Sequence, residues 1–265
     1  MPNLIQTPRL QLESDCEIAW IIADNPARMN ALTAEMWKAL PHLLAEAEGD
    51  DAIRVIVLRG AGERAFSTGA DISEFESART GEKAAEYDSL NHAAFSTLSA
   101  CTKPTISMIH GFCLGGGLGL ALATDIRLAD AKAEFAIPAA KLGLGYNARW
   151  VRPLLSAVSP SRAKEMLFTG RRFKAAEAAE MGLVNQVVEG SKLEETTRVL
   201  AKEIAANAPL TVRAAKRVID EITRHPETPD MAALDAVIAA CFDSDDYAEG
   251  RRAFLEKRKP RFQGR

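Results

Sequence analysis

The sequence predicts an α/β fold with a helical region toward its C-terminus, and three observations support this prediction. Apolar, strand-like runs alternate with helical segments through the first two-thirds of the chain. From Glu194 onward, one helical segment follows another, separated by prolines. In the middle of the chain, the β-rich run 105–110 leads into a glycine-rich segment, 111–119, and an apolar, alanine-rich helix follows.

Local signals predict the elements in the first part of the chain. The apolar run 17–23 is predicted to be a short strand, and the Asn-Pro pair after it predicts a turn over 24–30. Thr33 is a favourable N-cap for a helix that continues to about Glu48. Within that helix, Pro41 is expected to cause a kink or a break.

A strand buried on both faces is predicted at 53–58, because few polar residues interrupt this apolar run. A glycine-bearing loop, 60–71, and a charged, amphipathic helix, 82–98, are expected after it. The elements expected beyond the glycine-rich segment are strands at 126–129, 133–137 and 183–188, a loop leading into a helix at 141–151, and helices at 160–168 and 175–181.

Composition excludes several classes of function. A chain of 265 residues suits one large domain, alone or with an appendage, and a net charge of -3 gives no reason to expect nucleic acid or a membrane surface as partner. The cysteines are scattered and the histidines lack metal-ligand spacing, so we expect reduced thiols, no metal and a cytoplasmic location. No signal peptide or membrane span is indicated. NAD, ATP and α/β-hydrolase motifs are absent from the sequence.

The glycine-rich segment and the loop 65–72 are expected to act together. Glycines at the start of a helix let backbone N–H groups approach a ligand closely, and the helix dipole favours negative charge there. If each segment offers one N–H to the same oxygen, the pair forms an oxyanion hole, which stabilises charge developing on a carbonyl. The alternative for the glycine-rich segment is a tight turn in which glycine only relieves crowding.

Five segments in order resemble the crotonase (enoyl-CoA hydratase/isomerase) superfamily, over nearly the whole chain. The segments are 25–32, 65–75, 111–125, 176–184 and 252–260. The resemblance implies a spiral core of repeated ββα units over 1–200 and a helical trimerisation region over 201–265. It also implies a homotrimer or a dimer of trimers that binds an acyl-CoA thioester and needs no further cofactor.

By this resemblance, the backbone N–H groups of Ala70 and Gly116 form the oxyanion hole for a thioester enolate. Arg28 is expected to meet a CoA phosphate. Phe254 and Lys257 match residues that reach the nucleotide of CoA on a neighbouring subunit, although a solvated basic C-terminus is the alternative. The first oxyanion loop is expected to contribute to substrate binding through Ala65, Phe66, Ala70, Asp71 and Ile72.

Two positions depart from the pattern of a hydratase. A hydratase of this family has a glutamate two residues after the triple glycine and another after the proline that follows a short strand; Gly119 and Ala139 stand there instead. Neither can move protons, and general acid–base help is typically worth ~10²–10⁴-fold in rate. Tyr146 is a candidate donor of a hydrogen bond or proton, Arg149 a candidate ligand for a carboxylate or a polar acyl group, and His92 a further candidate. Their alternatives are aromatic packing, a solvated helix start, and a surface or core histidine.

The acidic residues of these loops have simpler interpretations. Asp71 and Asp125 are expected to make structural hydrogen bonds, and Glu63 and Glu74 to be solvated charges. The sequence thus predicts an acyl-CoA-binding enzyme of the hydratase/isomerase type that stabilises an enolate without the two hydratase glutamates. A decarboxylase or isomerase on the same scaffold, and a non-catalytic acyl-CoA-binding protein, remain the alternatives.

Overall fold

The computed structural model describes residues 5–7, 9–74 and 82–265. Its larger sheet has the order β1-β2-β3-β4-β6-β8-β11, antiparallel from β1 to β3 and parallel from β3 onward. The strands are β1 (Ile5–Thr7), β2 (Leu10–Asp15), β3 (Ile18–Ala23), β4 (Val55–Gly60), β6 (Thr105–Ile109), β8 (Ile126–Asp130) and β11 (Gln186–Val188).

A second, smaller sheet is formed by short strands that follow the long ones. It has the order β10-β9-β7-β5, with β5, β7 and β9 parallel. Each of the long strands β4, β6 and β8 is followed by one of these short strands, so the chain repeats a β-β-α order. Its strands are β5 (Ala65–Ser67), β7 (Phe112–Leu114), β9 (Glu134–Ala136) and β10 (Phe173–Lys174).

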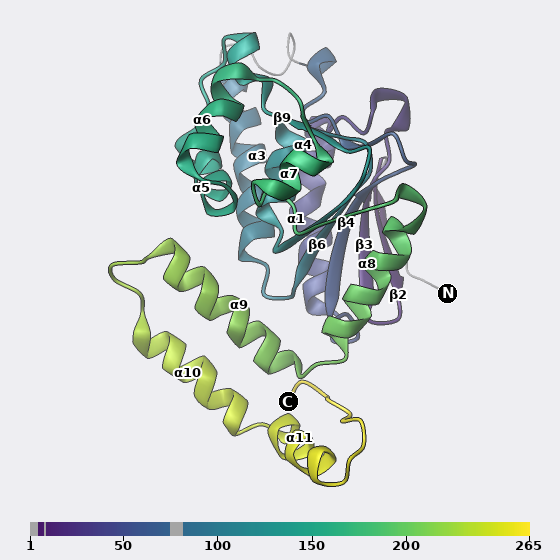
Figure 1. The fold of residues 1–265 in the computed structure, drawn as a ribbon, viewed down its shortest axis with the longest axis vertical. Helices are drawn as coiled ribbons and strands as arrows, with labels where there is room; N and C mark the ends of the chain where they lie inside the picture. Colours follow the sequence, from purple (N-terminus) through teal and green to yellow (C-terminus); the bar gives the residue numbers. More distant parts are fainter. Residues whose placement is uncertain (1–4, 8, 75–81) are drawn as a thin grey trace.

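The larger sheet is buried on both faces, as its apolar strands predict. Ala19 and Ile21 of β3 pack into the core beneath helices α1 and α3, whereas Ile18 and Trp20 face the core beneath α8. Figure 1 shows α8 on the opposite side of this sheet from α1 and α3. The helices of this part are α1 (Ala34–Gly49), α3 (Glu82–Ala100), α4 (Gly116–Ala123), α5 (Ala148–Ala157), α6 (Pro160–Thr169), α7 (Ala175–Glu180) and α8 (Gly190–Ala205).

The N-cap predicted for α1 is present, but the break predicted at Pro41 is absent. Thr33 Oγ1 accepts a hydrogen bond from the Met36 N–H at 3.3 Å, and the helix continues through Pro41 to Gly49. Leu40, Leu43 and Leu44 are buried around the proline. Their packing outweighs the loss of one helical hydrogen bond, so the helix remains a single element.

Other predicted boundaries were wrong where strands are very short. The expected loop 60–71 contains β5, the glycine-rich segment contains β7, and no strand was predicted at β1; each of these strands has three residues. β2 was also not predicted, although it has six residues and its buried Leu10 and Leu12 alternate with less buried residues. The strand expected at 183–188 begins only at Gln186. Strands of three residues show no periodicity of their own, and their neighbours in the sheet alone define them.

The C-terminal helices extend away from the sheets (Figure 1). They are α9 (Pro209–Arg224), α10 (Met231–Phe242) and α11 (Asp245–Leu255). The boundary expected at residue 200 lies inside α8, whose Ala201 and Ala205 still belong to the core beneath the sheet. Among the described helices, none combines the length and the apolar character needed to cross a bilayer.

Asp130 ties the end of β8 to the start of the glycine-rich segment. Its carboxylate accepts hydrogen bonds from the Gly111 and Lys132 N–H groups at 3.2 and 2.7 Å, and one oxygen lies 3.0 Å from His110 Nδ1. Burial acts to raise the pKa of Asp130, but these hydrogen bonds outweigh it and hold the pKa below its ordinary 3.8. The ionised carboxylate therefore stabilises the folded chain.

This contribution should depend on pH in a defined direction. Because the pKa is lowered on folding, the stabilisation is present above pH 3.8 and is lost as the pH falls through the folded-state value. Asp130→Asn should cost roughly 1–3 kcal/mol of unfolding free energy near neutral pH, and the difference from the unaltered chain should shrink at acid pH. Urea unfolding of both proteins between pH 3 and 7 measures this; a difference that stays constant with pH would contradict it.

Candidate active site

A cavity of about 500 Å³ lies where the two predicted oxyanion loops meet. Both Ala70 and Gly116 line it, as does the candidate Tyr146. Its other walls come from α3, from the segment after β9 and from the start of α5. These walls comprise Asp88, Asn91, Phe95, Ile137, Pro138, Ala139, Leu142, Leu144, Gly145, Asn147 and Trp150, and the two loops also contribute Thr68 and Gly115.

The first loop is held by hydrogen bonds on both sides of Ala70. Gly69 adopts a φ of +88° and donates its N–H to Ser67 Oγ at 3.1 Å. The Gly69 carbonyl accepts the Leu32 N–H at 2.7 Å, and the Asp71 N–H donates to the Leu32 carbonyl at 3.0 Å. Between these anchors, the Ala70 N–H has no hydrogen-bond partner among the described residues.

The second loop places the first residue of α4 beside the first loop. Gly115 has a φ of +52°, and its N–H donates to the Ala136 carbonyl of β9 at 2.8 Å. Gly117 packs so closely on β5 that an added Cβ would lie 2.3 Å from the Ser67 carbonyl oxygen. As the first residue of the helix, Gly116 has no intrahelical acceptor for its N–H.

The two loops touch at the predicted oxyanion hole. A Cβ added to Gly69 would lie 2.7 Å from the Gly116 nitrogen, so the backbones are in direct contact. Within the described part of the chain, the N–H groups of Ala70 and Gly116 donate to no other residue. Two unpaired amides that line one cavity can both donate to an oxygen that gains negative charge.

Arg28 and Asp71 form an ion pair at the edge of the first loop. Arg28 Nη1 lies 3.0 Å from Asp71 Oδ1 and 2.6 Å from Ser73 Oγ. Burial acts to raise the pKa of Asp71, but hydrogen bonds from Ser73 and the charge of Arg28 hold it below the ordinary value. Asp71 has the structural role expected of it. About half of the Arg28 side chain remains exposed to solvent.

Gly119 and Ala139, which stand where a hydratase of this family has glutamate, differ from each other in their surroundings. The ring of Phe95 covers Gly119, where an added Cβ would lie 2.9 Å from Phe95 Cε1 and Cζ. Ala139 lines the cavity itself. A side chain at position 139 would therefore enter the cavity, whereas one at 119 needs Phe95 to move.

Of the three side chains proposed as substitutes, one reaches the cavity. Tyr146 lines it, packs edge-on against Trp150 at 5.7 Å between ring centroids, and has no hydroxyl partner among the described residues. Burial raises the pKa of Tyr146 to about 12, so its hydroxyl is a neutral donor near pH 7. Arg149 and His92 are exposed and do not line the cavity; His92 Nδ1 lies 3.2 Å from Ser96 Oγ.

Several other predicted residues lie elsewhere. Ala65 and Phe66 are buried in β5 and do not line the cavity. Ile72 begins a 3₁₀ turn, and its side chain lies outside the described part.

Glu74, predicted to be a solvated charge, instead accepts the Ala34 N–H at the start of α1 at 2.9 Å. Asp125 accepts the Thr105 N–H at 2.7 Å and lies 2.8 Å from Lys216 Nζ, consistent with a structural role.

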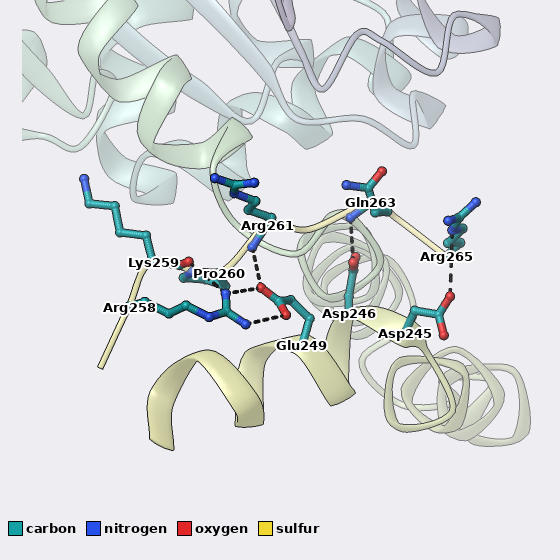
Figure 2. A pocket seen from close by; sticks show the side chains of 9 residues that line it. All are labelled: Asp245, Asp246, Glu249, Arg258, Lys259, Pro260, Arg261, Gln263 and Arg265. Carbon is teal, nitrogen blue, oxygen red and sulfur yellow. Dashed lines mark hydrogen bonds and ion pairs between the residues drawn. The ribbon is translucent and has the colours of Figure 1, made fainter. Parts of the chain in front are cut away.

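The C-terminal tail lies apart from this cavity. Figure 2 shows the hollow between α11 and the returning tail, where Arg258 and the Arg261 N–H bind Glu249 and the Gln263 N–H binds Asp246. Phe254 is 83% exposed, and neither it nor Lys257 lines the cavity of its own chain. Contact of these two residues with CoA would therefore require a neighbouring subunit.

Sequence reasoning missed four cavity residues, namely Asp88, Asn91, Phe95 and Trp150. The first three are spaced by three and four residues along α3, which places them on one face of the helix. That spacing is visible in the sequence, but it does not say which face meets the oxyanion loops. No group of His, Cys, Asp or Glu side chains within the described ranges has the arrangement of a metal site.

Comparisons with known proteins agree with the fold. The family model described as Enoyl-CoA hydratase/isomerase matches residues 13–265. The short-chain-enoyl-CoA hydratase of Clostridium acetobutylicum is 34% identical, over 94% of this chain and 95% of that protein. The carnitinyl-CoA dehydratase of Proteus mirabilis is 33% identical, over 97% and 98%. A crystal structure of an enoyl-CoA hydratase/carnithine racemase from Magnetospirillum magneticum superimposes with a TM-score of 0.94 at 38% identity, covering 98% of this chain and 97% of that one.

Proposed function

The chain belongs to the enoyl-CoA hydratase/isomerase family, and we propose that it binds an acyl-CoA thioester and stabilises the enolate of that thioester. The observation that supports this proposal is the pair of unpaired N–H groups, on Ala70 and Gly116, at one 500 Å³ cavity. A thioester oxygen between them would gain hydrogen bonds as its negative charge develops. The two donors are backbone groups of well-anchored loops, so they need little rearrangement when the charge forms.

The side chains around the cavity favour slow hydration. Gly119 and Ala139 supply no acid or base, whereas enolate stabilisation needs only the two amides. Arg149, which was considered as a ligand for an acyl carboxylate, does not line the cavity. No observation therefore favours decarboxylation as the second candidate.

Two assays test the proposal. Butyryl-CoA in D₂O should exchange its α-protons for deuterium in the presence of the protein, since exchange requires an enolate; ¹H NMR follows the lost signal. Crotonyl-CoA should be hydrated only slowly, as measured by its ultraviolet absorbance. A folded protein that neither binds nor exchanges butyryl-CoA would refute the proposed function, and binding without exchange would favour a non-catalytic acyl-CoA-binding protein.

Tyr146 is proposed as a hydrogen-bond donor to the acyl group. Its hydroxyl is neutral near pH 7 and has no hydrogen-bond partner among the described residues. Tyr146→Phe should lower the α-proton exchange rate about threefold to tenfold, the equivalent of roughly 0.5–1.5 kcal/mol for one hydrogen bond. An unchanged rate would show that the ring only packs against Trp150.

We also propose that the chain forms a homotrimer or a dimer of trimers through α9–α11. An apolar groove of about 1210 Å³ lies between these helices, and Ile219, Phe242, Phe254 and Leu255 are largely exposed around it. An apolar surface of this kind is unusual on a monomer, and a second copy of the chain would cover it. Such a neighbour would also give Phe254 and Lys257 access to a bound CoA.

A charge in this groove should dissociate the assembly. Ile219→Glu places a carboxylate among the apolar groove residues, which burial would strongly penalise. Sedimentation velocity should show the trimer or hexamer replaced by a smaller species. Thr223→Glu, an exposed position on the same helix outside the groove, is the matched control. If both variants sediment like the unaltered protein, α9 does not form the interface.

A further inference from the structure

One face of α3 forms part of the wall of the candidate active site. Asp88, Asn91 and Phe95 all line the cavity, and they follow one another at helical spacing. Phe95 is the residue whose ring covers Gly119. Because a helix rises 1.5 Å per residue, Asp88 lies two turns, about 10 Å, along α3 from that ring.

Asp88 supplies a carboxylate to the wall of the cavity, which the acidic residues of the two oxyanion loops do not reach. Among the described residues that line the cavity, it is the one with a carboxylate. Asp88 is also exposed, so it is in contact with both the cavity and solvent. A base in this position can take up a proton inside the cavity and release it to water.

Asn91 lines the cavity between Asp88 and Phe95 along α3. It is 5% exposed, and its Nδ2 donates to the Tyr87 carbonyl of its own helix at 2.7 Å. This hydrogen bond folds the short side chain back against α3.

We infer that Asp88 is the base that removes the α-proton of the bound acyl thioester; this inference rests on the proposed function. The α-carbon–hydrogen bond breaks and an O–H bond forms on the Asp88 carboxylate. The electron pair of the broken bond forms the C=C bond of the enolate, and the negative charge moves to the thioester oxygen. The N–H groups of Ala70 and Gly116 then donate to that oxygen. Return of the proton, or of a deuteron acquired from solvent, restores the thioester.

The test compares two acidic positions on the same helix. Asp88→Asn keeps the shape of the side chain and removes the base, so α-proton exchange of butyryl-CoA in D₂O should fall by 10²-fold or more, within the ~10²–10⁴-fold typical of general base catalysis. The dissociation constant for butyryl-CoA, measured by calorimetry, should change less than threefold. Glu86→Gln, an exposed position on α3 that does not line the cavity, should leave both quantities unchanged. Asp88→Glu should recover part of the lost rate.

The outcomes separate this inference from the proposed function. If Asp88→Asn retains more than a third of the exchange rate, Asp88 is not the base, while the enolate proposal stands. If the unaltered protein binds butyryl-CoA but exchanges no α-proton, the assignment of Asp88 is likewise overturned. If the unaltered protein does not bind butyryl-CoA, the proposed function fails and the inference fails with it.

Discussion

Replacement of Gly117 by alanine is expected to reduce α-proton exchange of butyryl-CoA by 100-fold or more. The added Cβ would lie 2.3 Å from the Ser67 carbonyl oxygen and 2.8 Å from its carbon, so α4 must move away from β5. That movement separates Gly116 from Gly69 and withdraws one of the two proposed donors. Loss of one oxyanion donor typically costs ~10²–10³ in rate, and the overpacking costs roughly 1–3 kcal/mol of unfolding free energy.

The controls for this prediction distinguish a lost donor from a lost fold. Gly49→Ala adds the same methyl group where no atom lies within 4 Å, and it should leave exchange unchanged. Ser67→Ala adds no bulk but removes the acceptor of the Gly69 N–H, and we expect a smaller loss of exchange with near-native circular dichroism. Full exchange activity in a well-folded Gly117→Ala protein would contradict the proposed oxyanion hole.

A variant with Phe95→Ala, Gly119→Glu and Ala139→Glu is expected to hydrate crotonyl-CoA at least 100-fold faster than the unaltered chain. The two glutamates restore the acid and base that the family resemblance expects, and such groups are typically worth ~10²–10⁴-fold. Removal of the Phe95 ring is required because this ring lies 2.9 Å from the position of a Cβ on residue 119. The loss of ultraviolet absorbance measures the rate.

The double variant that keeps Phe95 is the control for the triple one. Its glutamate at 119 cannot enter the cavity past the ring, so it should hydrate no faster than the unaltered chain and be less stable to urea. Equal hydration by the double and triple variants would show that Phe95 does not block this position. No gain in a folded triple variant would show that the missing glutamates do not account for slow hydration.

Much of the fold could be predicted because its signals are local. The apolar runs that became β3, β4 and β6 and the Thr33 cap of α1 are each recorded in a few adjacent residues. The strands β5 and β7 were not predicted, since three residues inside a glycine-bearing loop show no periodicity. They become strands only because the spiral brings them together with β9 as a second sheet.

The residues of the candidate site likewise divide into those predicted from local sequence and those that the sequence did not reveal. Ala70 and Gly116 were predicted from the loops that carry them, and both line the cavity. Asp88, Asn91 and Phe95 were missed because a helix has several faces, and the sequence does not say which one packs on α4. Arg149 and His92 were considered from their nearness in sequence to the site, but both side chains are exposed.

The sequence by itself determined the family, the two glycine-bearing loops and the absence of glutamate at positions 119 and 139, and the β-β-α order was expected only from the family resemblance. The tertiary structure alone decided that Phe95 occupies the space above Gly119 and that Asp88 shares a cavity with the two amides. The physical reason is the range of the interactions. Turn conformation and helix capping depend on neighbouring residues, whereas contacts between α3 and α4 depend on how the whole core packs.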